Sequence, residues 1–188
     1  KRQAISFLIT GVHKPKLTNP THLAVDGSTR GCVLDEGQAV CWNVNGPETV
    51  PSLTSPTTLA VGGNAICSTS NGQINCSGTT SYLKAKNGTP ATAVATNGSS
   101  KACGYDSSSV FCWGLSVSAN IGLAPSSVSN PKSLAVGYNH ACLIDDSGMK
   151  CWGDNSLGQL NNPVMTNPTQ VAVGQGHSCA LDAGTVKC

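Results

Sequence analysis

Residues 140–160 read HACLIDDSGMKCWGDNSLGQL, and this stretch decides the fold of the chain. Its two cysteines, Cys142 and Cys151, stand nine positions apart around an Asp-Asp-Ser-Gly turn. Read as a β-hairpin with Asp146 and Ser147 as its two-residue loop, the stretch places Cys142 opposite Cys151. Directly opposed residues in a non-hydrogen-bonded antiparallel pair have Cα atoms about 4.5 Å apart, which is within disulfide reach. The stretch therefore predicts a disulfide-bonded hairpin.

The same unit recurs along the whole chain. All ten cysteines fall into pairs nine positions apart: Cys32 and Cys41, Cys67 and Cys76, Cys103 and Cys112, Cys142 and Cys151, and Cys179 and Cys188. Successive first cysteines are separated by 35, 36, 39 and 37 residues. A regular period of this length is typical of a solenoid, a propeller or an array of repeats.

The spacing within each cysteine pair favours disulfides over zinc sites. Zinc ligands usually come as cysteines separated by about two to four residues, whereas an eight-residue spacer fits a bond across a hairpin. Five disulfides indicate an oxidising compartment, so we expect an extracellular or cell-surface location. The longest apolar run, residues 4–12, is shorter than the roughly 20 residues that span a bilayer, so we expect no direct membrane insertion.

The composition predicts an all-β protein. The 188 residues include 21 glycines and 10 prolines, only 11% are charged, and no apolar pattern with helical periodicity continues for three turns. The net charge of +2 and the scattered lysines form no basic stripe, so we expect no nucleic-acid partner.

The two ends of the chain resemble complementary halves of one repeat. Residues 15–20 (PKLTNP) align with residues 163–168 (PVMTNP), while the fifth repeat stops at its second cysteine. We therefore predict one domain, a five-bladed β-propeller with repeats at about 21–56, 57–90, 91–131, 132–168, and 169–188 plus 1–20. Residues 6–12 are expected to share a sheet with residues 185–188 and so to close the last blade. The alternative is an open array.

Two segments of the fourth repeat resemble a known family. Residues 134–142 (LAVGYNHAC) and 146–160 (DSGMKCWGDNSLGQL) resemble the regulator of chromosome condensation (RCC1) repeat, in particular its cysteine-paired form in secreted bacterial proteins. The resemblance implies a propeller of four-stranded blades that serves as a binding scaffold. A secreted member of the family inhibits β-lactamase, so an enzyme inhibitor is one alternative. Five blades and disulfides argue against the nucleotide-exchange activity of the nuclear member.

Seven residues are candidate ligand contacts. Basic side chains stand two positions before four of the first cysteines, and tryptophans follow three of the second cysteines: Arg30, Lys101, His140 and His177, and Trp42, Trp113 and Trp152. The basic residues could form a rim that binds an anion or an acidic glycan, or each could make local hydrogen bonds where its hairpin begins. The tryptophans could stack on sugar rings, or pack on disulfides and between blades.

No motif of a known catalytic site is present, so we predict neither an enzyme nor a bound cofactor or metal. Asp35, Asp145, Asp146 and Asp182 belong to the predicted hairpin turns, where aspartate is favoured. The sequence predicts a non-catalytic extracellular scaffold that binds a protein or a carbohydrate through loops such as Trp113–Val128 and Trp42–Pro51. The alternative is the structural or adhesive head of a cell-surface fibre or pilus-like assembly.

Overall fold

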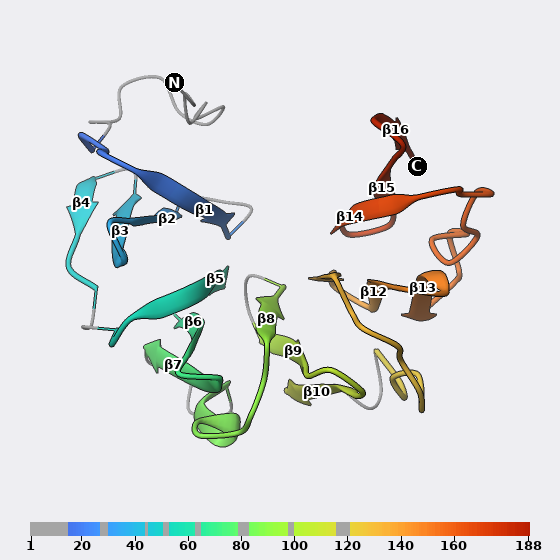
Figure 1. The fold of residues 1–188 in the computed structure, drawn as a ribbon, viewed down its shortest axis with the longest axis horizontal. Helices are drawn as coiled ribbons and strands as arrows, with labels where there is room; N and C mark the ends of the chain where they lie inside the picture. Colours follow the sequence, from blue (N-terminus) through green and yellow to red (C-terminus); the bar gives the residue numbers. More distant parts are fainter. Residues whose placement is uncertain are drawn as a thin grey trace.

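Five small antiparallel sheets follow one another along the chain, one for each predicted repeat (Figure 1). The computed structural model describes residues 15–26, 30–43, 45–50, 53–62, 65–78, 83–97, 100–115 and 121–188. Blade 1 contains β1 (Pro20–Val25), β2 (Gly31–Asp35), β3 (Gln38–Asn43) and β4 (Gly46–Glu48). Blade 2 contains β5 (Pro56–Gly62), β6 (Ala65–Ser70) and β7 (Gln73–Gly78), followed by the 3-10 helix η1 (Leu83–Lys86).

The remaining three blades have three strands each. Blade 3 contains β8 (Ala93–Thr96), β9 (Lys101–Tyr105) and β10 (Val110–Gly114). Blade 4 contains β11 (Ser133–Val136), β12 (His140–Asp145) and β13 (Gly148–Gly153), and blade 5 contains β14 (Pro168–Val173), β15 (Ser178–Asp182) and β16 (Thr185–Lys187). The first strand of each blade lies toward the centre of the molecule (Figure 1).

The cysteine hairpins form as the spacing predicts. Cys142 pairs with Cys151 in the β12–β13 ladder, and Asp145 lies opposite Gly148 across the two-residue turn. The five disulfides are Cys32–Cys41, Cys67–Cys76, Cys103–Cys112, Cys142–Cys151 and Cys179–Cys188, with Cα atoms 4.0–4.1 Å apart. The predicted pairing is therefore confirmed, with one disulfide in each blade.

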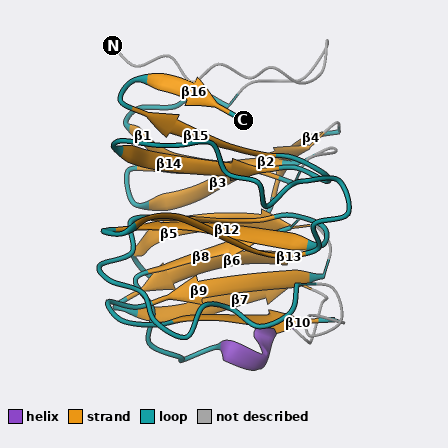
Figure 2. Cartoon of the chain, turned by 90° about the vertical axis from the view of Figure 1, so that its right-hand side faces the viewer, coloured by secondary structure: helices purple, strands orange, loops and turns teal. Residues whose placement is uncertain are grey.

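The blades stand side by side in an arc, and the cores lie between them. Each first strand packs against the first strand of the next blade, from β1 through β5, β8 and β11 to β14 (Figures 1 and 2). One apolar cluster joins Cys32 and Leu34 of blade 1 to Leu59 and Val61 of blade 2. Two further clusters fill the boundaries between blades 2 and 3 and between blades 3 and 4. The prediction of an all-β fold with five propeller-like blades is confirmed.

Four-stranded blades, which the family resemblance implies, are realised only in blade 1 among the described residues. There the chain turns at Asn43 and Gly46, which pair with each other, and returns as β4. In blade 4 the chain turns away from the sheet after β13, because the Asp154 N–H donates to the Asn139 carbonyl, 2.9 Å away. The following residues hydrogen-bond among themselves, with the Leu160 N–H donating to Asn155 Oδ1 at 2.8 Å. Local turn formation therefore replaces a fourth strand.

The predicted closure of blade 5 by residues 6–12 lies outside the described residues and stays a prediction. Within the described ranges, blades 1 and 5 are the two ends of the arc, and β1 and β14 stand apart (Figure 1). The only helix among these residues is η1, which is far too short to cross a membrane.

Candidate binding surface

In blades 1, 4 and 5 a hairpin-turn aspartate fastens the blade to the segment that leads into its first strand. Asp35 accepts hydrogen bonds from the backbone N–H groups of Thr18 at 2.9 Å and Asn19 at 2.6 Å. Asp145 accepts from the Ser129 N–H at 3.0 Å. Asp182 repeats the Asp35 arrangement with Thr166 and Asn167. Residues 15–20 therefore occupy the same place beside blade 1 as residues 163–168 occupy beside blade 5.

The carboxylates of Asp145 and Asp182 are held ionised by this arrangement. Burial by itself raises the pKa of Asp145, but hydrogen bonds from Lys150 at 2.6 Å and from Ser147 outweigh it, and the pKa lies well below the ordinary value. The hydrogen bond from Lys187 is the main cause of the lowered pKa of Asp182. Among the described residues no group of three or more His, Cys, Asp and Glu side chains could hold a metal ion.

Three of the four basic candidates make contacts within the fold. The Lys101 ammonium, in a nearly buried side chain of blade 3, donates to the Tyr138 carbonyl of blade 4 at 2.8 Å and lies 4.8 Å from the Tyr138 ring centroid. Arg30 forms an ion pair with Glu48 in its own blade. His140 is fully buried, whereas His177 is exposed. The side chains of Lys101, Arg30 and His140 therefore hold strands and blades together.

His140 joins blade 4 to blade 5 through a short chain of hydrogen bonds. Its Nε2 lies 2.9 Å from Ser178 Oγ, and that hydroxyl lies 2.9 Å from the Gln159 carbonyl. A carbonyl can only accept, so the single hydroxyl proton points to Gln159 and Nε2–H donates to the serine oxygen. Nδ1 is buried without a hydrogen-bond partner in the described structure. The imidazole is therefore best accommodated in its neutral form.

The stability of the protein is expected to fall as the pH drops below about 6.5, the ordinary value for histidine. Desolvation lowers the pKa of His140, and the opposing influences of the His177 backbone and Asp154 are smaller. The unfolded chain then takes up a proton that the folded chain excludes, so acidification favours unfolding. Denaturant titrations between pH 7.5 and pH 5 should show this loss. It should shrink in His140→Gln and persist in His177→Gln.

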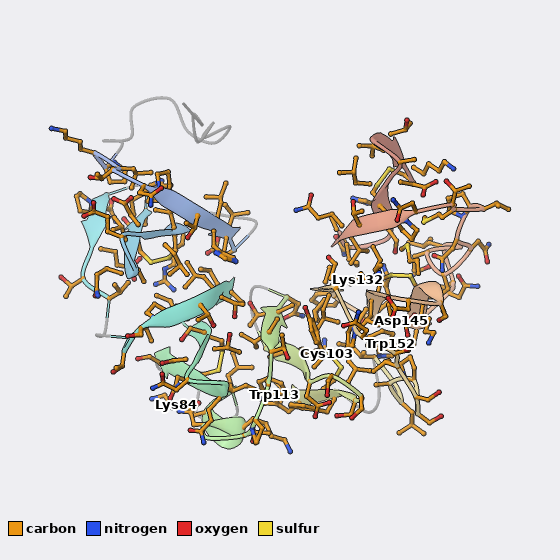
Figure 3. All side chains as sticks on the ribbon, viewed as in Figure 1. Lys84, Cys103, Trp113, Lys132, Asp145 and Trp152 are labelled. Atoms are coloured by element: carbon orange, nitrogen blue, oxygen red, sulfur yellow. A yellow bond between two sulfur atoms is a disulfide. The ribbon has the colours of Figure 1, made fainter. Side chains whose placement is uncertain are left out.

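Two of the three tryptophans lie between blades. Trp113 belongs to the cluster between blades 2 and 3, and its indole N–H donates to the Leu83 carbonyl at 2.8 Å. Trp152 belongs to the cluster between blades 3 and 4 (Figure 3). Trp42 is half-buried and lies over Gly31, where a Cβ atom would approach its ring to 2.9 Å. Of the three, only Trp42 is partly exposed.

The exposed aliphatic residues of the connecting segments are features that the sequence analysis did not single out. Leu115 and Leu123 follow blade 3, and Leu157 and Val164 follow blade 4, with Leu123 93% and Val164 89% exposed. The described parts of both segments lie on the outer side of the arc (Figure 1). The only sequence signal was the presence of large apolar residues in stretches otherwise rich in Gly, Pro, Ser and Asn. The first segment overlaps the predicted contact loop Trp113–Val128.

The comparison with protein-family models supports the resemblance read from the sequence. Residues 132–159 match the family model described as the regulator of chromosome condensation (RCC1) repeat. This range covers β11, β12 and β13 together with the turns that follow. The recognition of the RCC1 repeat is confirmed there, and the five disulfides match the cysteine-paired form.

Solved structures share the fold at low sequence identity. The ectodomain of the Physcomitrella patens receptor kinase CR4 matches with a TM-score of 0.65 and 22% identity, over 84% of this chain and 47% of that one. The CRINKLY WD40 ectodomain of the Arabidopsis thaliana receptor kinase ACR4 matches with a TM-score of 0.62 and 21% identity, over 83% and 57%. Yeast RCC1 (Prp20), solved in a structure with Kap60, matches with a TM-score of 0.59 and 16% identity, over 82% and 52%. This chain thus spans about half the length of these structures.

Proposed function

We propose that this protein is a non-catalytic extracellular scaffold that binds another protein through the connecting segments after blades 3 and 4. The observation that carries the proposal is the exposure of four large aliphatic side chains on these segments, Leu115, Leu123, Leu157 and Val164. Loops held by a rigid scaffold are the usual place for binding residues. The disulfide hairpins supply that rigidity, and removal of exposed aliphatic surface from water supplies the driving force.

A protein fits this surface better than a carbohydrate. Stacking on a sugar requires an open aromatic face. Trp113 and Trp152 are buried between blades. Tyr138 is 53% exposed, but the Lys101 ammonium lies 4.8 Å from its ring centroid and occupies one face. Trp42 and His177 retain exposed surface and remain candidate contacts at the edge of such an interface.

The disulfides support an extracellular location. Reducing conditions in the cytosol keep most thiols free, whereas disulfides persist outside the cell. All ten cysteines are paired here, and two of the structures that share the fold are receptor ectodomains. An adhesive head or an enzyme inhibitor would act in the same compartment, and the identity of the partner separates these alternatives.

The test is affinity capture of secreted proteins followed by measurement of the binding constant of each captured partner. The double variant Leu123→Asp/Val164→Asp should keep the melting temperature of the parent chain, because both side chains project into solvent. It should lose at least about tenfold in affinity, as expected for removal of an interface anchor. Glu36→Lys, at an exposed hairpin turn of blade 1, serves as the control. Unchanged binding by the double variant, or binding only to a glycan array, would contradict the proposal.

A further inference from the structure

Equivalent residues of the five blades differ sharply in exposure at the two ends of the arc. Leu23 and Val25 of β1 are 55% and 54% exposed. Their equivalents in β5, Leu59 and Val61, are 8% and 2% exposed, because they pack against blade 1. The same sequence pattern is thus buried or partly buried where a preceding blade exists and exposed in blade 1.

The opposite end shows the converse difference. The first cysteines of blades 1 to 4, namely Cys32, Cys67, Cys103 and Cys142, are all 0% exposed. In blade 5, Cys179 is half-buried, while Cys188 and Ala172 are exposed. Ala172 lies opposite Cys179 in the ladder, as Ala60 lies opposite Cys67 in blade 2, where both residues are buried.

The internal boundaries show what covers such a face. At each of the first three boundaries, the disulfide of one blade packs against aliphatic residues of the first strand of the next. In blades 3 and 4 the tryptophan after the second cysteine joins this contact. Cys179–Cys188 is the disulfide half of this interface, and Leu23 with Val25 is the aliphatic half. The two halves lie at opposite ends of the arc (Figure 1).

The exposed histidine of blade 5 fits the same scheme. His140 of blade 4 bonds to Ser178 of blade 5, and His177 holds the equivalent position in blade 5. A following blade that packed on blade 5 as blade 5 packs on blade 4 would cover the exposed side chain of His177. The positions equivalent to Ser178 in blades 1 to 4 are Gly31, Ile66, Ala102 and Ala141, so the serine partner is particular to blade 5 and the apolar packing carries the argument.

We propose that both end faces are packing surfaces for further blades of the same repeat, supplied by polypeptide outside residues 1–188. Such a blade places an aliphatic pair on the Cys179–Cys188 disulfide, and the last added blade places its own disulfide on Leu23 and Val25. A single strand added beside β16 would extend the sheet of blade 5 but leave its face bare. The proposal concerns the ends of the arc and is independent of the connecting-segment surface.

The test adds one blade in phase. Residue 188 is equivalent to residue 151, so a second copy of residues 152–188 appended after Cys188 supplies a connecting segment and a complete further blade. Brief exposure to a mild reductant, followed by alkylation and peptide mass spectrometry, reports the accessibility of each disulfide. In the 188-residue chain, Cys179–Cys188 should be reduced at least tenfold faster than the other four, whose intact state also shows that the protein is folded. In the extended chain it should be as slow as those four.

A matched control destroys the packing face of the added blade. In this extended chain the copies of Val171 and Val173 in the appended segment are replaced by aspartate, and Cys179–Cys188 should remain fast. Equal protection by the control, or no protection by the intact extension, would overturn the proposal. It would also be overturned if Cys179–Cys188 were already slow in the 188-residue chain. If deletion of residues 1–14 then made reduction of Cys179–Cys188 fast, those residues would be what covers this disulfide. If reduction became slower as the protein concentration rose, a second copy of the chain would be what covers it.

Discussion

Gly153→Ala is expected to destabilise the protein by about 2–6 kcal/mol, from backbone strain of about 1–3 kcal/mol and overpacking of similar size. Gly153 has a φ of +116°, a conformation that side chains disfavour. A Cβ atom there would collide with the Asn139 carbonyl oxygen and lie 2.7 Å from the His140 Cα. Backbone atoms cannot swing aside as a flexible side chain can, so the β12–β13 hairpin must distort. Urea unfolding measures the loss.

Gly148→Ala separates the two causes. Gly148 has nearly the same φ, +114°, but nothing lies within 4 Å of the Cβ atom that alanine would add. Its replacement should cost only the strain of about 1–3 kcal/mol. If the two variants unfold at the same urea concentration, the close approach at Gly153 is not what requires glycine. Gly114 of blade 3 has a similar φ, +123°, and similar backbone crowding, so Gly114→Ala should behave like Gly153→Ala.

Trp152→Ala is expected to cost about 3–5 kcal/mol, the range for a buried aromatic residue. The indole is 7% exposed and packs in the cluster that holds blade 3 against blade 4. Trp152→Phe should cost clearly less, because the indole N–H has no hydrogen-bond partner and phenylalanine keeps much of the apolar volume. Thermal and denaturant unfolding measure both variants.

Trp42→Ala provides the comparison for a tryptophan at the end of the arc. The half-buried ring of Trp42 lies over Gly31, so its removal should cost less than that of Trp152. If Trp152 were instead a platform for a sugar ring, Trp152→Ala would leave the free energy of unfolding nearly unchanged and would abolish carbohydrate binding.

The sequence by itself determined the features that depend on neighbours close along the chain. A disulfide between Cys142 and Cys151 needs only a two-residue turn and the alternation of a hairpin, so the cysteine spacing and the Asp-Asp-Ser-Gly turn were sufficient to predict it. The five-fold recurrence of that spacing then predicted the number of blades. The aspartates of the turns were likewise placed correctly, because their positions follow from the hairpin.

Only the tertiary structure decided the features that depend on a neighbouring blade. His140 and His177 stand at equivalent positions in the sequence, yet one is buried against Ser178 and the other is exposed, because only the first has a following blade among the described residues. Leu23 and Leu59 differ for the same reason at the other end of the arc. A repeat pattern records what each blade can pack against, whereas burial depends on which faces are actually covered, and that is a property of the assembled arc.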